Sequence, residues 1–415
     1  METGLAYSMD HVVPILGMRP GRQHQVRLVV RDESGLTAST QPLTLTTDPL
    51  PDDFPSIKVL ISEPDRMEEG VTMFDVIHWP ASGTDNNYGL LVALDSAGEV
   101  VWYYKTGSNV GNARRLSNGN ILYMSGRAGH LYEIDMLGNV MAEWHTDRGP
   151  VEELGEGSIR VDTETFHHEA YETVSGNILT ISSEVREFER YPTSATDPAA
   201  PRSTSNVLGD VLVEFTRRGD IVREAKLLDL LDPYRVRYDS LGGGFWAPVY
   251  AETFDHPLRD WAHTNAVVSD STGRYAMASS RAQDAVVKID LEAGELVWIL
   301  GEHGGWGPEW QDYLLTPVGD FMWQYHQHAP MFTPEGTILM FDNGNNRAWP
   351  FEPPMASAES FSRVVEYRVD EERMEVEQVW SYGGPGVTSI SSRRSSVTPT
   401  GSSGKGTSWT PTAAA

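Results

Sequence analysis

The sequence predicts an all-β protein in which a partial β-sandwich precedes a β-propeller. Three observations support this prediction. A unit of strand, glycine turn and strand recurs through most of the chain, and a second glycine-led strand recurs in phase with it. A proline-rich segment separates these repeats from residues 1–47.

The first element, residues 1–47, is expected to be the end of a β-sandwich of the fibronectin or immunoglobulin type. Residues 26–32 (VRLVVRD) and 40–47 (TQPLTLTT) have the β-branched composition of strands. A complete sandwich needs about seven strands, and about two to four precede the linker. The first residues (METG) lack the basic stretch and apolar core of a signal peptide. We expect the missing strands and a signal sequence to lie upstream.

The second element is an extended linker over residues 48–55 (DPLPDDFP), where three prolines and three acidic residues stand together. The propeller is expected to occupy residues 56–383. Its hairpins, with apolar residues alternating around a glycine turn, are predicted at residues 91–102, 131–140, 212–222 and 287–298, with a looser copy at 365–380.

The other half of each repeat is an apolar strand that follows a glycine turn. Gly119, Gly176, Gly273 and Gly336 each introduce such a strand. The two halves together give four strands per unit, and five units can be read, which is typical of propeller blades. A series of unrelated hairpins is the alternative, and five copies in phase argue against it.

The last element, residues 384–415, differs from everything before it. All but seven of its thirty-two residues are Gly, Ser, Thr, Pro or Ala, and none is acidic. Such a segment cannot bury a core and is predicted to be disordered. Because it begins where a further blade is expected, it can also be the product of a truncation or frame shift.

The composition excludes several classes of function. A net charge of −27 argues against a nucleic-acid-binding surface, which needs clustered Lys and Arg. The absence of cysteine removes disulfides, thiol catalysis and Cys-ligated metal sites. No apolar run reaches the roughly 18 residues of a membrane span.

Polar residues occupy one position in three successive repeats. His168, Asn265 and His328 stand eight residues before Gly176, Gly273 and Gly336. Two residues earlier stand Phe166, His263 and His326. Residues two apart on a strand share a face, so these side chains are expected to converge on the central channel. The predicted cluster, with an arginine sixteen residues after Asn265, is His168, His263, Asn265, Arg281 and His328.

Other interpretations of this cluster remain open. A single histidine beside an apolar strand is more often structural, and this role is expected for His167, which alternation points away from the channel. Three histidines can also bind zinc, but the adjacent Arg281 would repel a cation, so no metal is predicted. The coincidence of three motifs in register favours a functional site.

Several of these segments resemble the bacterial aryl-sulfate sulfotransferases. The likeness is carried by residues 260–267 (DWAHTNAV), 279–281 (SSR), 287–290 (VKID), 298–306 (WILGEHGGW), 328–330 (HAP) and 341–344 (FDNG). It extends from about Tyr88 to Gly383. The resemblance implies a six-bladed propeller behind a small β-sandwich. It also implies a periplasmic or secreted enzyme without a cofactor that moves sulfuryl groups from phenolic sulfates to phenols, independently of a nucleotide donor.

The resemblance also implies roles for individual residues. His328 matches the nucleophile that forms a sulfohistidine, Arg281 matches the assisting arginine, and His168 with Glu169 matches a His-His-Glu motif. His263 and Asn265 match the His-x-Asn motif. This chain departs from the family in two respects, since its sixth blade is not readable and it has no cysteine.

The chemistry suits these residue types. The planar fork of Arg281 fits two sulfuryl oxygens, and Asn265 adds a neutral donor. His263, or else His168, is expected to protonate the leaving phenol and to deprotonate the acceptor. The flanking aromatic residues are expected to hold the ring, with plain packing as the alternative: Phe166, Trp261, Trp323 and Tyr325.

We therefore predict an aryl-sulfate sulfotransferase with a phenolic sulfate donor and a phenol acceptor. Two alternatives remain. One is an inactive binding or scaffold propeller, which the unreadable blade favours, and the other is a metal-dependent hydrolase that uses the same histidines. The sequence does not determine the oligomeric state, and a homodimer is among the states it allows.

Overall fold

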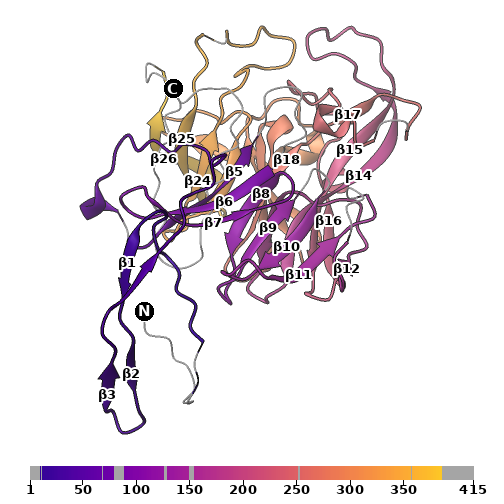
Figure 1. Ribbon diagram of the computed structural model, residues 1–415. Coiled ribbons are helices and arrows are strands. Elements are labelled where there is room, and N and C mark those ends of the chain that lie inside the picture. Colours follow the sequence, from indigo (N-terminus) through magenta and orange to yellow (C-terminus); the bar gives the residue numbers. More distant parts are fainter. Residues whose placement is uncertain are drawn as a thin grey trace. The chain divides into compact units, whose positions relative to one another are not determined.

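The computed structural model describes residues 10, 12–67, 69–78, 88–125, 129–148, 154–250, 253–356 and 358–385, and the regular structure within them is almost entirely β (Figure 1). These residues divide into two compact units between Val110 and Gly111. No helix among them combines the length and the apolar composition needed to cross a membrane. The low-complexity segment predicted from Gly384 lies outside the described residues beyond Pro385.

The smaller unit begins with a long, exposed hairpin. Strand β1 (Gln23–Val26) pairs with β4 (Leu43–Thr46), and between them β2 (Val29–Arg31) pairs with β3 (Thr37–Ser39). The predicted strands therefore exist in part. A sandwich requires a second packed sheet, and none covers this hairpin among the described residues of the unit, where its apolar side chains are exposed. The predicted sandwich is not confirmed.

The first propeller sheet also belongs to the smaller unit. It consists of β5 (Thr72–His78), β6 (Tyr88–Leu94) and β7 (Val100–Lys105). Leu50 and Phe54, from the segment expected to be a linker, pack against its apolar cluster. The Tyr88 hydroxyl donates to the backbone oxygen of Asp53 at 2.8 Å. This extended segment is therefore attached to the sheet that it precedes.

The larger unit contains the other four sheets. The first two are formed by β8 (Val110–Arg115), β9 (Ile121–Ser125), β10 (His130–Ile134), β11 (Val140–His145) and β12 (Ile159–Arg160), and by β13 (His167–Glu172), β14 (Ile178–Tyr191), β15 (Ser203–Phe215), β16 (Ile221–Lys226) and β17 (Leu258–Asp260). The single α-helix among the described residues, α1 (Leu227–Leu230), follows β16.

The last two sheets have the same plan. They are formed by β18 (Thr264–Ser269), β19 (Tyr275–Ser280), β20 (Ala285–Asp290) and β21 (Glu295–Gly301), and by β22 (Thr316–Val318), β23 (His328–Phe332), β24 (Ile338–Asp342), β25 (Arg363–Asp370) and β26 (Glu375–Gly383). The fold is thus a β-propeller with five blades in chain order, as predicted. The sixth blade of the expected fold has no counterpart among the described residues.

The five predicted hairpins form pairs of adjacent antiparallel strands, one in each sheet, and the short parallel strands β12 and β22 lie outside two of them. The glycines at their turns have positive φ, for example 86° at Gly138 and 87° at Gly219, which explains why glycine recurs there. Apolar clusters join neighbouring sheets. Trp144 and Phe166 lie in the cluster of the second and third sheets, Trp261 in that of the third and fourth, and Trp298 in that of the fourth and fifth.

The innermost strands of the last three sheets, β13, β18 and β23, lie next to one another. Each is irregular near its start, with register shifts at His167/Ala170, Thr264/Ala266 and His328/Met331. Such bulges redirect side chains and break the alternation of faces. They occur at the positions where the polar motifs stand in the sequence.

Polar side chains on the inner strands β8, β13 and β18 connect one sheet to the next. The backbone N–H of Ala170 donates to Asn112 Oδ1 at 2.9 Å, and that of Val267 donates to Glu169 Oε2 at 2.8 Å. Farther along, Asn265 Nδ2 donates to the backbone oxygen of Gln327 at 2.8 Å. The geometry of the strand starts is therefore fixed from sheet to sheet.

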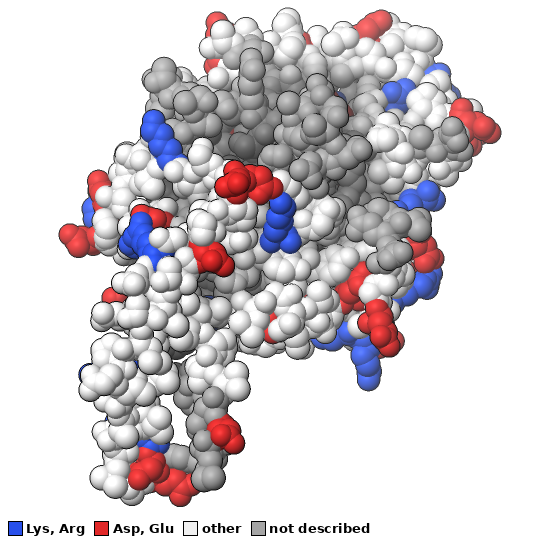
Figure 2. All heavy atoms as spheres, viewed as in Figure 1, with Lys and Arg blue, Asp and Glu red and all other residues white. Residues whose placement is uncertain are grey.

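The described surface is consistent with the acidic composition. On the face that Figure 2 shows, described Lys and Arg side chains lie interspersed with Asp and Glu and do not gather into a basic patch.

Candidate functional site

Four of the five predicted site residues lie together, with His168, His263 and His328 at the starts of the inner strands and Arg281 just after the end of β19. The rings of His168 and His263 meet edge to face, with centroids 5.0 Å apart. Burial, and repulsion by the Arg281 guanidinium and by the neighbouring imidazoles whenever they are protonated, hold the pKa of His168 well below its ordinary value. The three imidazoles and the guanidinium are therefore within electrostatic range of one another, although more than a hundred residues separate the first from the last.

His328 opens strand β23, and its ring is held at one nitrogen. The Nδ1 atom lies 2.6 Å from Asn343 Oδ1 and 3.2 Å from the backbone oxygen of His326. Because both partners are acceptors, Nδ1 carries the proton and Nε2 carries the lone pair. Burial and the charge of Arg281 lower the pKa of His328 to about 3, so the ring is neutral at pH 7. A neutral imidazole with a free lone pair is a competent nucleophile.

His263 precedes β18 with φ 48° and pairs with a buried acid three residues earlier. Its Nδ1 donates to Asp260 Oδ2 at 2.5 Å, and Asp260 is only 2% exposed. The absence of a side chain at Gly244 leaves room for the Asp260 carboxylate, because a Cβ atom at residue 244 would lie 2.4 Å from Asp260 Oδ2. A carboxylate behind an imidazole fixes its tautomer and stabilises its protonated form, which suits a general acid and base.

His168 is oriented by its neighbour in the chain. The two Nδ1 atoms of His167 and His168 are 2.8 Å apart, and His167 Nε2 lies 3.1 Å from the backbone oxygen of Ser182. That oxygen requires a proton on His167 Nε2, so a neutral His167 accepts at Nδ1 and His168 donates. His167 is buried and packs edge-on against Trp246, which fits its expected structural role.

Arg281 begins the 3-10 turn η3 (Arg281–Gln283) directly after β19. Its guanidinium Nη2 lies 3.6 Å from Asp239 Oδ2, and its side chain is 21% exposed. Among the described residues, the guanidinium of Arg281 makes this ion pair and no hydrogen bond. Its N–H groups are therefore available to an anion.

Asn265 is buried beside the cluster, but its donor is engaged. The Nδ2 atom donates to the backbone of Gln327, the residue before His328, and Oδ1 has no partner among the described residues. The contact supports a role in positioning the segment that carries His328. A direct role as a donor to the substrate stays a prediction.

The four aromatic candidates fall into two groups. Phe166 and Trp261 are fully buried in the clusters between sheets, and Trp323 packs against Phe321 with ring centroids 4.7 Å apart. Packing, the alternative role, is the one that these contacts support. Tyr325 is half-buried, with the guanidiniums of Arg237 and Arg347 5.8 and 5.6 Å from its ring centroid.

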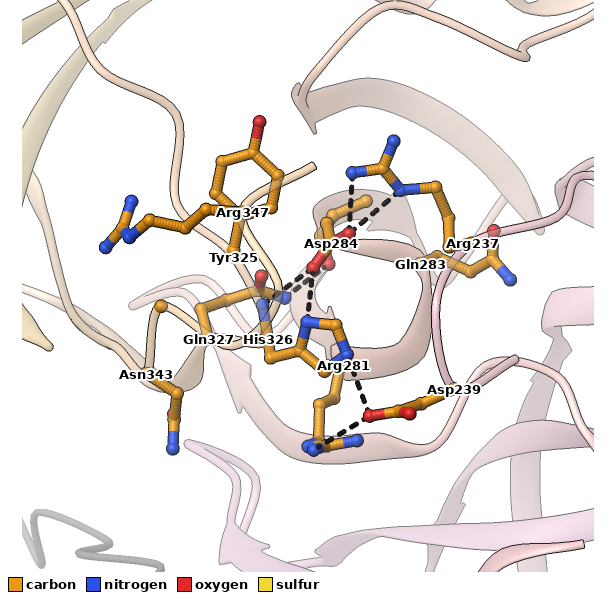
Figure 3. A network of polar contacts seen from close by, with 12 residues as sticks. Arg237, Asp239, Arg281, Gln283, Asp284, Tyr325, His326, Gln327, Asn343 and Arg347 are labelled. Atoms are coloured by element: carbon orange, nitrogen blue, oxygen red, sulfur yellow. Dashed lines mark hydrogen bonds and ion pairs between the residues drawn. The ribbon is translucent and has the colours of Figure 1, made fainter. Parts of the chain in front are cut away.

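Sequence reasoning missed the charged residues around His326. The His326 ring is 0% exposed, with Nδ1 2.9 Å from Asp284 Oδ1 and Nε2 3.2 Å from Asp239 Oδ2 (Figure 3). Neither contact has the geometry of a hydrogen bond, so both are ion pairs. Burial alone would lower the pKa of His326, but the two carboxylates raise it above its ordinary value.

Local geometry explains why the sequence did not indicate the charged residues around His326. His326 has φ 51°, so the alternation of strand faces that groups it with His328 does not apply. Asp239 lies in the connection between β16 and β18, and Asp260 ends the three-residue strand β17 within it, so no periodicity marks either residue. Asn343 and Asp260 could have been found from the sequence, because they lie inside the segments 341–344 and 260–267 that carry the family resemblance.

Comparisons with known proteins agree with one another. The model of the family described as Arylsulfotransferase (ASST) matches residues 57–413. The arylsulfate sulfotransferase AssT of Lelliottia amnigena is 28% identical over 290 residues, which are 61% of this chain and 44% of that protein. The protein of the same name from Escherichia coli O6:H1 is 29% identical over the same shares. The chain thus spans less than half the length of these curated relatives.

Solved structures align only weakly with the whole chain. The X-ray structure of a hypothetical selenium-binding protein from Sulfolobus tokodaii matches with a TM-score of 0.38 and 8% identity, covering 74% of this chain and 66% of that one.

Proposed function

This chain belongs to the arylsulfotransferase family, and from that premise we propose that it moves a sulfuryl group from a phenolic sulfate ester to a phenol through a covalent adduct on His328. The observation that carries the proposal is the tautomer of His328. Its Nδ1 proton is directed to Asn343, no described residue hydrogen-bonds to its Nε2, and the Arg281 guanidinium acts electrostatically on the ring.

In the first half-reaction, His328 Nε2 attacks the sulfur in line with the aryl oxygen. The N–S bond forms, the S–O bond to the aryl group breaks, and the protonated His263 gives its proton to the leaving oxygen. The adduct carries a positive imidazole ring and a negative sulfuryl group, and the ring keeps its proton on Nδ1, which donates to Asn343 Oδ1. Asp260 stabilises His263 while it is protonated.

The second half-reaction reverses these steps with a phenol as acceptor. His263 removes the phenol proton, the phenol oxygen attacks sulfur, and the S–N bond breaks to restore neutral His328. By analogy with phosphoryl transfer, the transition state is loose, and catalysis depends on position and charge. The free N–H groups of Arg281 suit the sulfuryl oxygens, and a donor of this kind contributes about 3–4 kcal/mol to the barrier.

Burst kinetics and mass spectrometry test the proposal together. Without an acceptor, p-nitrophenyl sulfate should release one equivalent of p-nitrophenol and leave a sulfuryl group on the peptide that contains His328. Addition of phenol should then start steady turnover. Continuous release without acceptor would indicate a hydrolase, and its loss with a chelator would indicate a metal. Absence of any release would indicate a binding propeller.

We also propose that the enzyme is periplasmic or secreted. In either location it would meet phenols from outside the cytoplasm. Fractionation of cells that express the full-length gene, followed by detection of the protein, tests this expectation.

A further inference from the structure

Asp239 stands at an unfavourable place in a tight turn. The backbone N–H of Ser240 donates to the oxygen of Arg237 at 3.2 Å and closes a four-residue turn, which the Ser240 hydroxyl reinforces through contacts with the N–H and the oxygen of Arg237. Asp239 is the third residue and has φ 70°. That position favours Gly or Asn, so the turn itself does not explain an aspartate.

The carboxylate of Asp239 contacts both an imidazole and a guanidinium. Its Oδ2 atom lies 3.2 Å from His326 Nε2 and 3.6 Å from Arg281 Nη2 (Figure 3). The side chain is 53% exposed, and its charged end faces these two groups. Asp239 therefore links a buried imidazole to the guanidinium of the candidate site.

The buried end of this link is firmly held. Asp284 contacts His326 through Oδ1, which also accepts the backbone N–H of His326 at 2.7 Å. Its other oxygen, Oδ2, accepts Arg237 Nε at 2.8 Å, and Arg237 is fully buried. Basic and acidic groups alternate from Arg237 through Asp284, His326 and Asp239 to Arg281. Because the first three are buried, the position of Asp239 is set from the interior.

We propose that Asp239, held by His326, is a positioning residue that fixes the guanidinium of Arg281 for the sulfuryl group. The inference rests on the proposed function. Among the described residues, one contact of 3.6 Å restrains the guanidinium and leaves its N–H groups free for sulfuryl oxygens. Without it, a long and partly exposed side chain would sample other orientations, and displacement of a catalytic group by about 1 Å can slow a reaction a hundredfold.

A double-mutant cycle tests whether Asp239 acts through Arg281. Asp239→Asn keeps the shape and suits the turn, and it should slow single-turnover release of p-nitrophenol about tenfold or more. In the Arg281→Gln background the same change should alter the rate less than about twofold, since the group that it positions is absent. Asp255→Asn, which removes an exposed charge from the same connection, is the control and should leave the rate unchanged.

Asp239→Gly separates positioning from folding. Glycine relieves the positive φ, so the melting temperature should stay the same or rise, while the release rate falls as in Asp239→Asn. If either Asp239 variant releases p-nitrophenol within about twofold of the wild-type rate, or if Asp239→Asn slows both backgrounds equally, the inference is wrong.

Binding provides a readout that does not need turnover. Benzenesulfonate offers three anionic oxygens but cannot transfer them, and its Kd can be measured by calorimetry for the four proteins of the cycle. The effects of Asp239→Asn and Arg281→Gln should be non-additive by at least about threefold, and additive effects would overturn the inference. If the wild type is inactive but the effects of the two substitutions on Kd are non-additive, the proposed function is wrong and the inference that Asp239 positions Arg281 stands.

Discussion

The Nδ1 atom of His328 lies 2.6 Å from Oδ1 of Asn343, and this contact determines which nitrogen of the ring is nucleophilic. The backbone oxygen of His326 accepts from the same atom at 3.2 Å. Two acceptors at Nδ1 leave the lone pair on Nε2, and Arg281 and His263 act electrostatically on the same ring. The residues around His328 thus select a tautomer before any substrate binds.

Asn343→Asp should change the pH dependence of transfer in a defined direction. A carboxylate beside Nδ1 favours the charged imidazole, so the pKa of His328 should rise from about 3. The acid limb of the rate profile should move to higher pH, with lower activity at pH 6 and recovery at pH 8. Asn343→Leu removes the acceptor without adding charge and should lower kcat about tenfold at every pH. Equal profiles for Asn343→Asp and the wild type would contradict this role.

His328→Asn should abolish transfer and also change the acid stability of the fold. A histidine with a depressed pKa binds its proton more weakly when folded, so the protein loses stability as the pH falls from about 6.5 toward 3. The slope from this group is at most about 1.4 kcal/mol per pH unit. Urea denaturation at several pH values should show a smaller slope for His328→Asn. His256→Asn, at an exposed imidazole, is the control and should keep both activity and slope.

The blades and three histidine motifs could be predicted because their signals are local. Glycine turns at positive φ and alternating apolar residues mark a hairpin wherever it lies. The site depends on contacts that have no such signal. Asp260 and Asp239 come from an irregular connection, and the bulges at His168 and His328 change which side chains share a face. Phe166 and Trp261 adjoin the motifs in sequence, yet the packing of neighbouring sheets buries them.

Asp260→Asn should slow transfer most for poor leaving groups. The amide cannot stabilise a protonated His263, so the proton donor is weakened, and general acid catalysis typically contributes a hundredfold or more. Phenyl sulfate, whose phenoxide is the stronger base, should lose about a hundredfold in kcat/KM, whereas p-nitrophenyl sulfate should lose far less. An equal loss for both donors would show that Asp260 supports the fold and not the proton transfer.

Glu169→Gln should destabilise the propeller. Glu169 is 1% exposed, and its Oε1 accepts from Arg114 Nη2 and from Asn112 Nδ2, while Oε2 accepts the backbone N–H of Val267. A glutamine offers one acceptor oxygen and no negative charge to the buried guanidinium of Arg114. Loss of one partner from a buried pair costs about 3–5 kcal/mol.

Glu172→Gln provides the matched comparison for this prediction on the same strand. Glu172 pairs with Arg217 where both side chains are partly exposed, so its substitution should cost about 1 kcal/mol or less. Urea denaturation of both variants measures the difference directly. Because the hydrogen bonds of Glu169 run to Arg114, Asn112 and the backbone of Val267, the folded Glu169→Gln protein should keep transfer activity near the wild-type value at low temperature. A stable variant that has lost activity would instead place Glu169 in the chemistry of the site.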